Sequence, residues 1–157
     1  MTVSLDELDL TIIEALQEDG RTPFDKIASQ TGASARTISA RVSRLIEEGV
    51  IDIIAVVNPE RVGYPVLAAV FIETEMAKTK AVAETLAKMP EIAFVSLTSG
   101  DPEIYASVRA QSNHALATLM TEKLPCIEGI RRSRMLLVLD VVKAASKWSI
   151  PKEPPHV

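Results

Sequence analysis

The first part of the chain repeats its apolar positions with the period of an α-helix. Leucine and isoleucine recur at three- and four-residue spacing, at Leu5, Leu8, Ile12 and Leu16. This pattern predicts a first helix that starts at a capping box, Ser4-x-x-Glu7, and ends near Glu18, before Asp19-Gly20.

Two further helices are predicted before residue 50. Pro23 stands where the second helix begins, and Gly32 suits the positive φ of the tight turn that ends it. Ser34 is a good N-cap for a third helix, whose inward apolar stripe consists of Ile38, Val42, Leu45 and Ile46. Three helices with a glycine-containing turn between the last two predict a helix-turn-helix domain.

Strand-like patterns follow the helices. Residues 51–57, Ile-Asp-Ile-Ile-Ala-Val-Val, are mostly β-branched and predict the wing of a winged helix-turn-helix domain over residues 1–58. Residues 59–65 contain Gly63 and Pro65 and predict a linker.

The remaining pattern predicts an α+β domain over residues 66–143, followed by a proline-containing tail over 144–157. Its elements have the order βαββαβ of the ferredoxin-like fold. The expected ranges are a strand at 66–73, a helix at 78–89, strands at 92–98 and 104–110, a helix at 113–124 and a last strand at 130–142.

Two of these strands are apolar on both alternating faces, over residues 66–72 and 135–139. One face of an antiparallel sheet usually turns polar where it meets water. A second protein surface is therefore expected on the face away from the helices, and the simplest candidate is the same sheet of another subunit. Coverage by the tail or by the N-terminal domain is the alternative.

The distribution of charge changes what the net charge suggests. The formal net charge is −4, yet the segment from Lys26 to Leu45 contains no acidic residue. Its basic residues are Lys26, Arg36, Arg41 and Arg44. Because phosphates respond to the local face presented to them, an acidic total does not exclude nucleic acid as a partner.

The third helix is the candidate DNA-binding element. Guanidinium groups bind phosphate and guanine edges, hydroxyls bind phosphate or bases, and small residues allow close approach. The N-terminal end of such a helix enters the major groove first, and its exposed amides can meet a phosphate. The predicted site for double-stranded DNA is Lys26, Ser34, Arg36, Thr37, Ala40, Arg41 and Arg44. A solvated basic face on a packing helix is the alternative.

Signals for an enzyme are weak. His114 and His156 lack metal-ligand spacing, and the single cysteine, Cys126, has no adjacent histidine or lysine and is expected to be a buried thiol. The chain contains neither a P-loop nor a G-x-G-x-x-G run. No catalytic residue, metal or cofactor is therefore expected.

The expected location is the cytoplasm. The N-terminus has neither a basic nor an apolar region typical of a signal peptide. No apolar run is long enough to span a bilayer, so no membrane partner is expected. One cysteine fits a reducing compartment.

Several short motifs together carry a family resemblance. They are Leu5-Asp6-x-x-Asp9, Asp19-Gly20-Arg21, Thr31-Gly32-Ala33-Ser34, Gly49-Val50-Ile51, Asn58-Pro59, Pro90-Glu91-Ile92, Ser99-Gly100-Asp101 and Gly129-Ile130. In this order and spacing, from Leu5 to about Val142, the chain resembles the Lrp/AsnC, or feast/famine, family of bacterial and archaeal transcriptional regulators.

The resemblance implies a regulatory second domain that pairs its sheets back to back in dimers, which assemble into tetramers or octamers. It also implies a small-molecule effector, usually an amino acid, bound between dimers at a Gly-x-x-Asp loop. That loop falls on residues 100–103, where Glu103 replaces the usual aspartate and Pro102 removes one amide donor. The implied effector residues are Ser99, Gly100, Asp101, Glu103, Ser133 and Met135.

The predicted function is an effector-responsive regulator that binds pseudo-palindromic DNA as a homo-oligomer. One alternative is an architectural DNA-binding protein of the same fold without a ligand. Another is an enzyme, since some proteins similar to this family decarboxylate modified tetrapyrroles. That chemistry needs pocket histidines and arginines, and this chain offers few of them.

Overall fold

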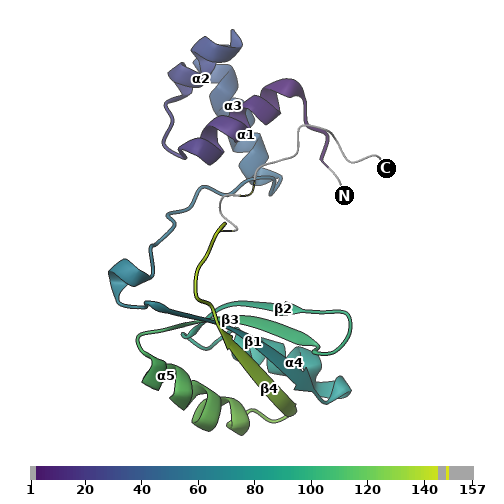
Figure 1. The fold of residues 1–157 in the computed structure, drawn as a ribbon. Coiled ribbons are helices and arrows are strands. Elements are labelled where there is room, and N and C mark those ends of the chain that lie inside the picture. Colours follow the sequence, from purple (N-terminus) through teal and green to yellow (C-terminus); the bar gives the residue numbers. More distant parts are fainter. Residues whose placement is uncertain (1–2, 145–147, 149–157) are drawn as a thin grey trace. The chain divides into compact units, whose positions relative to one another are not determined.

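The computed structural model describes residues 3–144 and 148 (Figure 1). They form two compact units, each with its own hydrophobic core. One unit is built from the residues up to Val56 with the described residues from Lys143 onward, and the other spans Val57–Val142.

The first unit contains α1 (Glu7–Glu18), α2 (Phe24–Thr31) and α3 (Ala35–Glu47), which confirms the helix-turn-helix prediction. The turn between α2 and α3 depends on Gly32, whose φ of 74° is left-handed. Ser34 caps α3 by accepting a hydrogen bond from the Thr37 amide at 3.1 Å. The core of the unit consists of Ile12, Ile13, Leu16, Ile27, Ile38, Val42 and Leu45.

Two local predictions for these helices are wrong. The capping box is not at Ser4 and Glu7 but at Asp6 and Asp9, where each carboxylate accepts the other residue's amide, at 2.9 and 3.2 Å. Ile46 is not an inward residue, since it is 42% exposed. It directly follows the buried Leu45, so a rotation of about 100° carries it off the core face.

The predicted wing strand is not formed within the described chain. Residues 51–57 have no ladder partner, and Ile53, Ile54, Val56 and Val57 are between 49% and 75% exposed. A strand needs a neighbour to satisfy its backbone groups, and local β propensity cannot supply that neighbour.

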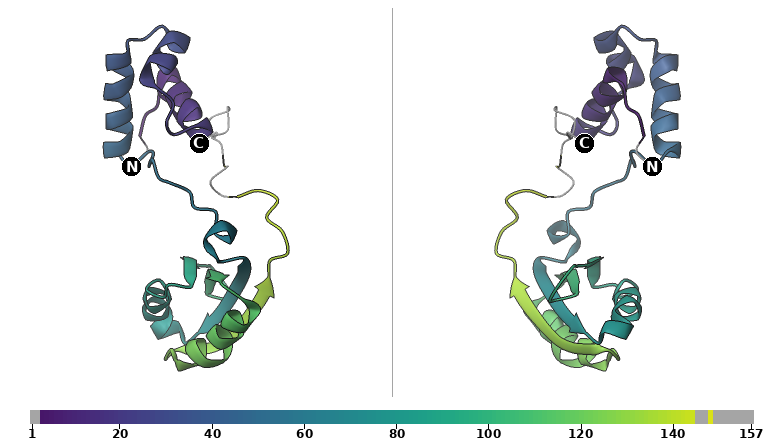
Figure 2. Two further views of the ribbon diagram at one scale, coloured as in Figure 1. Left: turned by 90° about the vertical axis from the view of Figure 1, so that its left-hand side faces the viewer. Right: turned by 90° about the vertical axis from the view of Figure 1, so that its right-hand side faces the viewer.

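The second unit is an antiparallel sheet in the order β2-β3-β1-β4, with α4 and α5 packed on one face (Figures 1 and 2). Its principal elements are β1 (Val66–Thr74), α4 (Thr79–Leu86), β2 (Ile92–Leu97), β3 (Ile104–Ala110), α5 (Asn113–Thr118) and β4 (Ile130–Leu137). The predicted βαββαβ order is confirmed. The last strand ends at Leu137 rather than at 142.

Short helical turns join these elements. Glu60–Val62 forms a 3₁₀ turn inside the predicted linker, and Met76–Lys78 forms another before α4. A π-helical turn, Leu119–Lys123, continues α5 and is followed by a 3₁₀ turn, Leu124–Cys126. Among the described residues, no helix combines the length and the apolar character that crossing a membrane requires.

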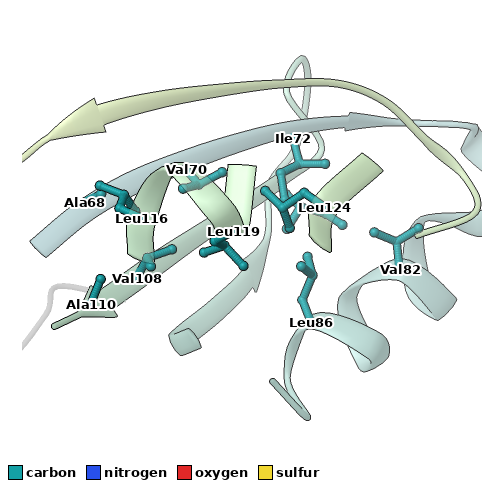
Figure 3. Close-up of a cluster of buried hydrophobic side chains, with 11 residues drawn as sticks. Ala68, Val70, Ile72, Val82, Leu86, Val108, Ala110, Leu116, Leu119 and Leu124 are labelled. Atoms are coloured by element: carbon teal, nitrogen blue, oxygen red, sulfur yellow. The ribbon is translucent and has the colours of Figure 1, made fainter. Parts of the chain in front are cut away.

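The core of the second unit lies between the sheet and its helices, as Figure 3 shows. Alternate residues of β1 and β3 are buried on this side, in accordance with the two-residue period of strands. They meet Val82 and Leu86 of α4 and Leu116 of α5. Leu119 and Leu124 from the following turns complete the core.

The opposite face of the sheet, called the outer face below, is also rich in apolar side chains. Its members are Leu67, Ala69 and Phe71 of β1, Phe94 of β2, Tyr105 of β3 and Leu136 of β4. The Phe71 and Tyr105 ring centroids are 5.5 Å apart, and the Arg134 guanidinium lies 5.2 Å from the Phe71 ring. Within residues 57–142, no helix covers this face.

Gly129→Ala is expected to destabilise the second unit. Gly129 has a φ of +98°, and an added Cβ would lie 2.8 Å from the Lys78 Cβ and 3.1 Å from the Val82 Cγ2. The substitution combines a left-handed backbone penalty of about 1–2 kcal/mol with overpacking of about 1–3 kcal/mol. Urea denaturation should show a correspondingly lower free energy of unfolding.

Gly63→Ala is the matched control. Gly63 has a φ of +90°, but no atom lies within 4 Å of an added Cβ. This variant should show the backbone penalty alone. Equal losses in the two variants would contradict the contribution from packing.

Candidate nucleic-acid interface and effector loop

The exposed face of α3 is the candidate nucleic-acid interface. Arg36, Thr37 and Ala40 are exposed on it, as predicted, and Ser34 is exposed at its N-terminal end. The Arg36 side chain makes no hydrogen bond or ion pair with any described residue. Lys26 of α2 is exposed as well.

Two more exposed hydroxyl residues of α3, Ser39 and Ser43, were missed by the sequence argument. They lie three residues after Arg36 and Ala40, a spacing that keeps residues on one helical face. The helical period alone was therefore enough to include them.

Arg41 and Arg44 are turned toward α1 instead of projecting fully into solvent. The Arg41 Nη1 lies 2.6 Å from an Asp6 oxygen and 3.0 Å from an Asp9 oxygen, and the Arg44 Nη2 lies 2.5 Å from the other Asp9 oxygen. Asp9 is only 1% exposed, whereas the two arginine side chains are 30% and 37% exposed. We call Asp6, Asp9, Arg41 and Arg44 the Asp9 cluster.

The Asp9 cluster pairs the buried Asp9 carboxylate with cations and reduces the positive charge that α3 presents to solvent. A buried carboxylate is stable only when it is paired and hydrogen-bonded, and Asp9 meets both conditions. The two carboxylates and two guanidinium groups of the cluster have no net charge. Arg36 and Lys26 are therefore the remaining cations of the acid-free segment from Lys26 to Leu45. The DNA contacts predicted for Arg41 and Arg44 would have to compete with this pairing.

Hydrogen bonds and the ion pair between the two side chains shift the pKa values of Asp6 and Arg41. The pKa of Asp6 is lowered, chiefly because its carboxylate accepts the Asp9 backbone amide and then because it pairs with Arg41. The pKa of Arg41 is raised, chiefly by its hydrogen bond to Asp6. Both shifts favour the charged forms.

The candidate effector loop connects β2 to β3. Ser99, Gly100 and Asp101 are exposed, and Gly100 has a φ of 126°. Thr98 joins the two ends of the loop by hydrogen bonds. Its amide donates to the Glu103 carbonyl at 2.8 Å, and its hydroxyl donates to the Pro102 carbonyl.

Glu103 has a partner within the sheet. Its Oε2 accepts the Thr74 amide at 2.9 Å, which joins the start of β3 to the end of β1. This contact satisfies a donor where the ladder between β1 and β4 shifts its register. Asp101 is thus the more accessible acid of the loop.

Ser133 and Met135 lie on β4, opposite Ile72 and Val70 of β1. Met135 packs against the core of the unit, and Ser133 is half-buried. β1 separates Ser133 from Ile104 at the start of β3, a distance of two strand spacings, or roughly 10 Å. Strand β1 therefore lies between Ser133 and the start of β3, which follows the loop.

The remaining reactive side chains in the described part of the chain form no cluster. His114 is exposed at the start of α5, and His156 lies outside the described residues. Cys126 is exposed rather than buried, because it ends a 3₁₀ turn where its thiol donates to the Glu122 carbonyl. No metal-binding group of three histidine, cysteine or acidic residues occurs in the part of the chain that the structure describes.

Comparison with known proteins places the chain among DNA-binding regulators. A family model for the AsnC-type helix-turn-helix domain matches residues 5–46, and a model for the Lrp/AsnC ligand binding domain matches residues 67–148. The HTH-type transcriptional regulator FL11 of Pyrococcus furiosus is 38% identical over 147 residues, which cover 93% of this chain and 97% of that protein. The chain belongs to the Lrp/AsnC family.

Solved structures agree with this assignment. Escherichia coli AsnC superposes with a TM-score of 0.84 at 28% identity and covers 92% of this chain and 99% of its own. A transcriptional regulator of Neisseria meningitidis, solved as an L-Met complex, has a TM-score of 0.85 at 21% identity, over 94% and 97% of the chains, and shows the shared fold. The chain is a helix-turn-helix transcriptional regulator with a ligand-binding domain.

Asp6→Asn is expected to remove a pH-dependent part of the stability of the helical unit. Asparagine also caps helices well, so the cap remains while the ionisable group is lost. Because folding lowers the pKa of Asp6, its carboxylate stabilises the fold above the ordinary pKa of 3.8 and loses this effect as the pH falls below it. The helix signal in circular dichroism should melt at a lower temperature in the variant at neutral pH.

The difference in melting temperature should shrink toward zero as the pH falls below about 4. Glu14→Gln serves as the control, because Glu14 is an exposed acid on the same helix. A wild-type advantage over Asp6→Asn that stays constant with pH would contradict the explanation.

Proposed function

We propose that the chain is a sequence-specific regulator that binds pseudo-palindromic operators as a homo-oligomer and responds to a small-molecule effector. The observation that carries the DNA-binding part is the exposed face of α3, with Arg36 near its N-terminal end. A side chain there enters the major groove first. Ser34, Thr37 and Ala40 supply the hydroxyls and the close approach around it.

The proposed effector is an amino acid at the loop of residues 99–103. Support comes from the exposed Gly100 and Asp101, a turn and a carboxylate suited to an effector's carboxylate and ammonium groups. The L-Met complex of the Neisseria meningitidis regulator provides an example on the same fold. Glu103 would serve mainly to hold the loop, since it binds the Thr74 amide.

The proposed dimer pairs the outer faces of two sheets. Aromatic and aliphatic side chains on this face form an apolar surface that burial would stabilise. A two-fold contact of one face with itself needs no second complementary surface. Effector binding between such dimers would change the spacing of their α3 helices, and through it the ability to engage both half-sites together.

Arg36→Ala is the variant that tests DNA binding. It should weaken binding and reduce the slope of log K against log salt by about 0.9 for each lost phosphate contact. Fluorescence anisotropy with operator fragments, identified by genomic footprinting, measures both quantities. Arg61→Ala is the control, since Arg61 is an exposed arginine of the other unit. Unchanged affinity and slope in Arg36→Ala would refute the assigned interface.

Phe71→Glu tests the dimer. The substitution removes the apolar ring and places a charged carboxylate in the contact, so light scattering after gel filtration should show a larger monomer fraction. Met76→Glu is the matched control, because Met76 is 92% exposed and lies in the turn before α4. Equal effects of the two variants would speak against the outer face as the contact.

A further inference from the structure

A pocket of the α+β unit lies at the end of the sheet away from the candidate effector loop. The register pairs Val66 with Ala110 and Ile92 with Val108, so the starts of β1 and β2 adjoin the end of β3. Ala68, Ala110 and Leu116 mark this end on the left of Figure 3. The loop of residues 99–103 precedes β3 and so lies at the opposite end.

The pocket has a volume of about 290 Å³, and its lining combines apolar surface with several polar side chains. Tyr64, Glu91, Arg109, Gln111, Thr118 and Lys123 contribute to its lining. A water molecule takes up about 30 Å³, so the pocket could hold a ligand with the volume of roughly ten water molecules. It suits a compact metabolite better than a nucleotide or a peptide.

Glu91 supplies an unsatisfied acceptor. Its Oε1 binds the Lys123 ammonium, whereas its Oε2 is buried and has no hydrogen-bond partner among the described residues. The Lys123 ammonium lowers the pKa of Glu91, so the group is a carboxylate at neutral pH. A buried acceptor without a partner costs free energy that a donating ligand can recover.

Arg109 supplies the complementary charge. It occupies the last position of β3 on the outer face, opposite Leu67 and between the buried Val108 and Ala110. There it borders the pocket at the end of the sheet, and its amide donates to the Glu91 carbonyl at 2.8 Å. Its guanidinium makes no ion pair within residues 57–142. Guanidinium groups bind carboxylates with two parallel hydrogen bonds.

The backbone around Lys123 is unusual too. Lys123 ends the π-helical turn that continues α5, while Thr118 lies just before this turn. Such turns occur frequently at functional sites. Here the turn brings Lys123 to Glu91 and so closes one side of the pocket.

The geometry points to a second small-molecule site in this pocket, for a compact zwitterion whose ammonium binds Glu91 and whose carboxylate binds Arg109. The site does not depend on the loop of residues 99–103 being an effector site. Lys123 keeps one Glu91 oxygen occupied, which leaves one acceptor for the ligand.

Calorimetry on the full chain with the twenty L-amino acids, used singly as zwitterionic probes, tests the site. Glu91→Gln and Arg109→Gln should each weaken binding of a positive probe about ten- to hundredfold. The same probe without its amine, or without its carboxylate, should bind more weakly to the wild-type protein. Glu84→Gln is the matched control and should leave this binding unchanged, because Glu84 is an exposed acid of α4 outside both proposed sites. Asp101→Asn separately reports on binding at the loop of residues 99–103.

Hydrogen exchange on the wild-type protein locates the bound probe without any substitution, so a loss of stability in a variant cannot affect this result. A bound probe should protect residues 109–118 more than residues 99–103. Loss of binding only in Asp101→Asn, with protection confined to 99–103, would overturn the second site and support the proposed effector loop. Absence of binding across the panel would overturn both, while the DNA-binding test of Arg36→Ala would stand unaffected.

Discussion

The buried carboxylate of Asp9 is the interaction on which the DNA-binding unit depends. It receives the Asp6 amide at the start of α1 and two guanidinium groups from α3, so one side chain caps one helix and fixes the other. The arginines of α3 therefore have different roles. Arg41 and Arg44 hold the helix in place, and Arg36 is left as the arginine that projects from its exposed face.

The same pairing gives a physical account of why an acidic protein can carry a DNA-binding helix. Acidic residues in α1 neutralise the arginines that pack against them, while the face of α3 away from α1 has small, hydroxyl and basic side chains. Binding of phosphate depends on that local face rather than on the net charge of −4.

The α+β unit is organised by a sheet with two apolar faces. Its helices cover one face and leave the other as the surface proposed for the dimer. The two ends of the sheet differ in chemistry: one carries the exposed loop of Gly100 and Asp101, and the other carries the pocket of Glu91 and Arg109. Ligands at the two ends would contact different strands of one sheet. Each ligand could therefore affect the proposed dimer contact separately.

The sequence by itself determined the three helices, the βαββαβ order, the two-sided strands and the exposed positions around Arg36. Each depends on local periodicity, on turn residues such as Gly32, or on motif order, all of which act over short stretches of chain. Tertiary structure decided the partners of Arg41, the tie between Glu103 and Thr74, and the absence of a wing strand at residues 51–57. These depend on contacts between residues far apart in sequence, or on a neighbouring strand that no local pattern reveals.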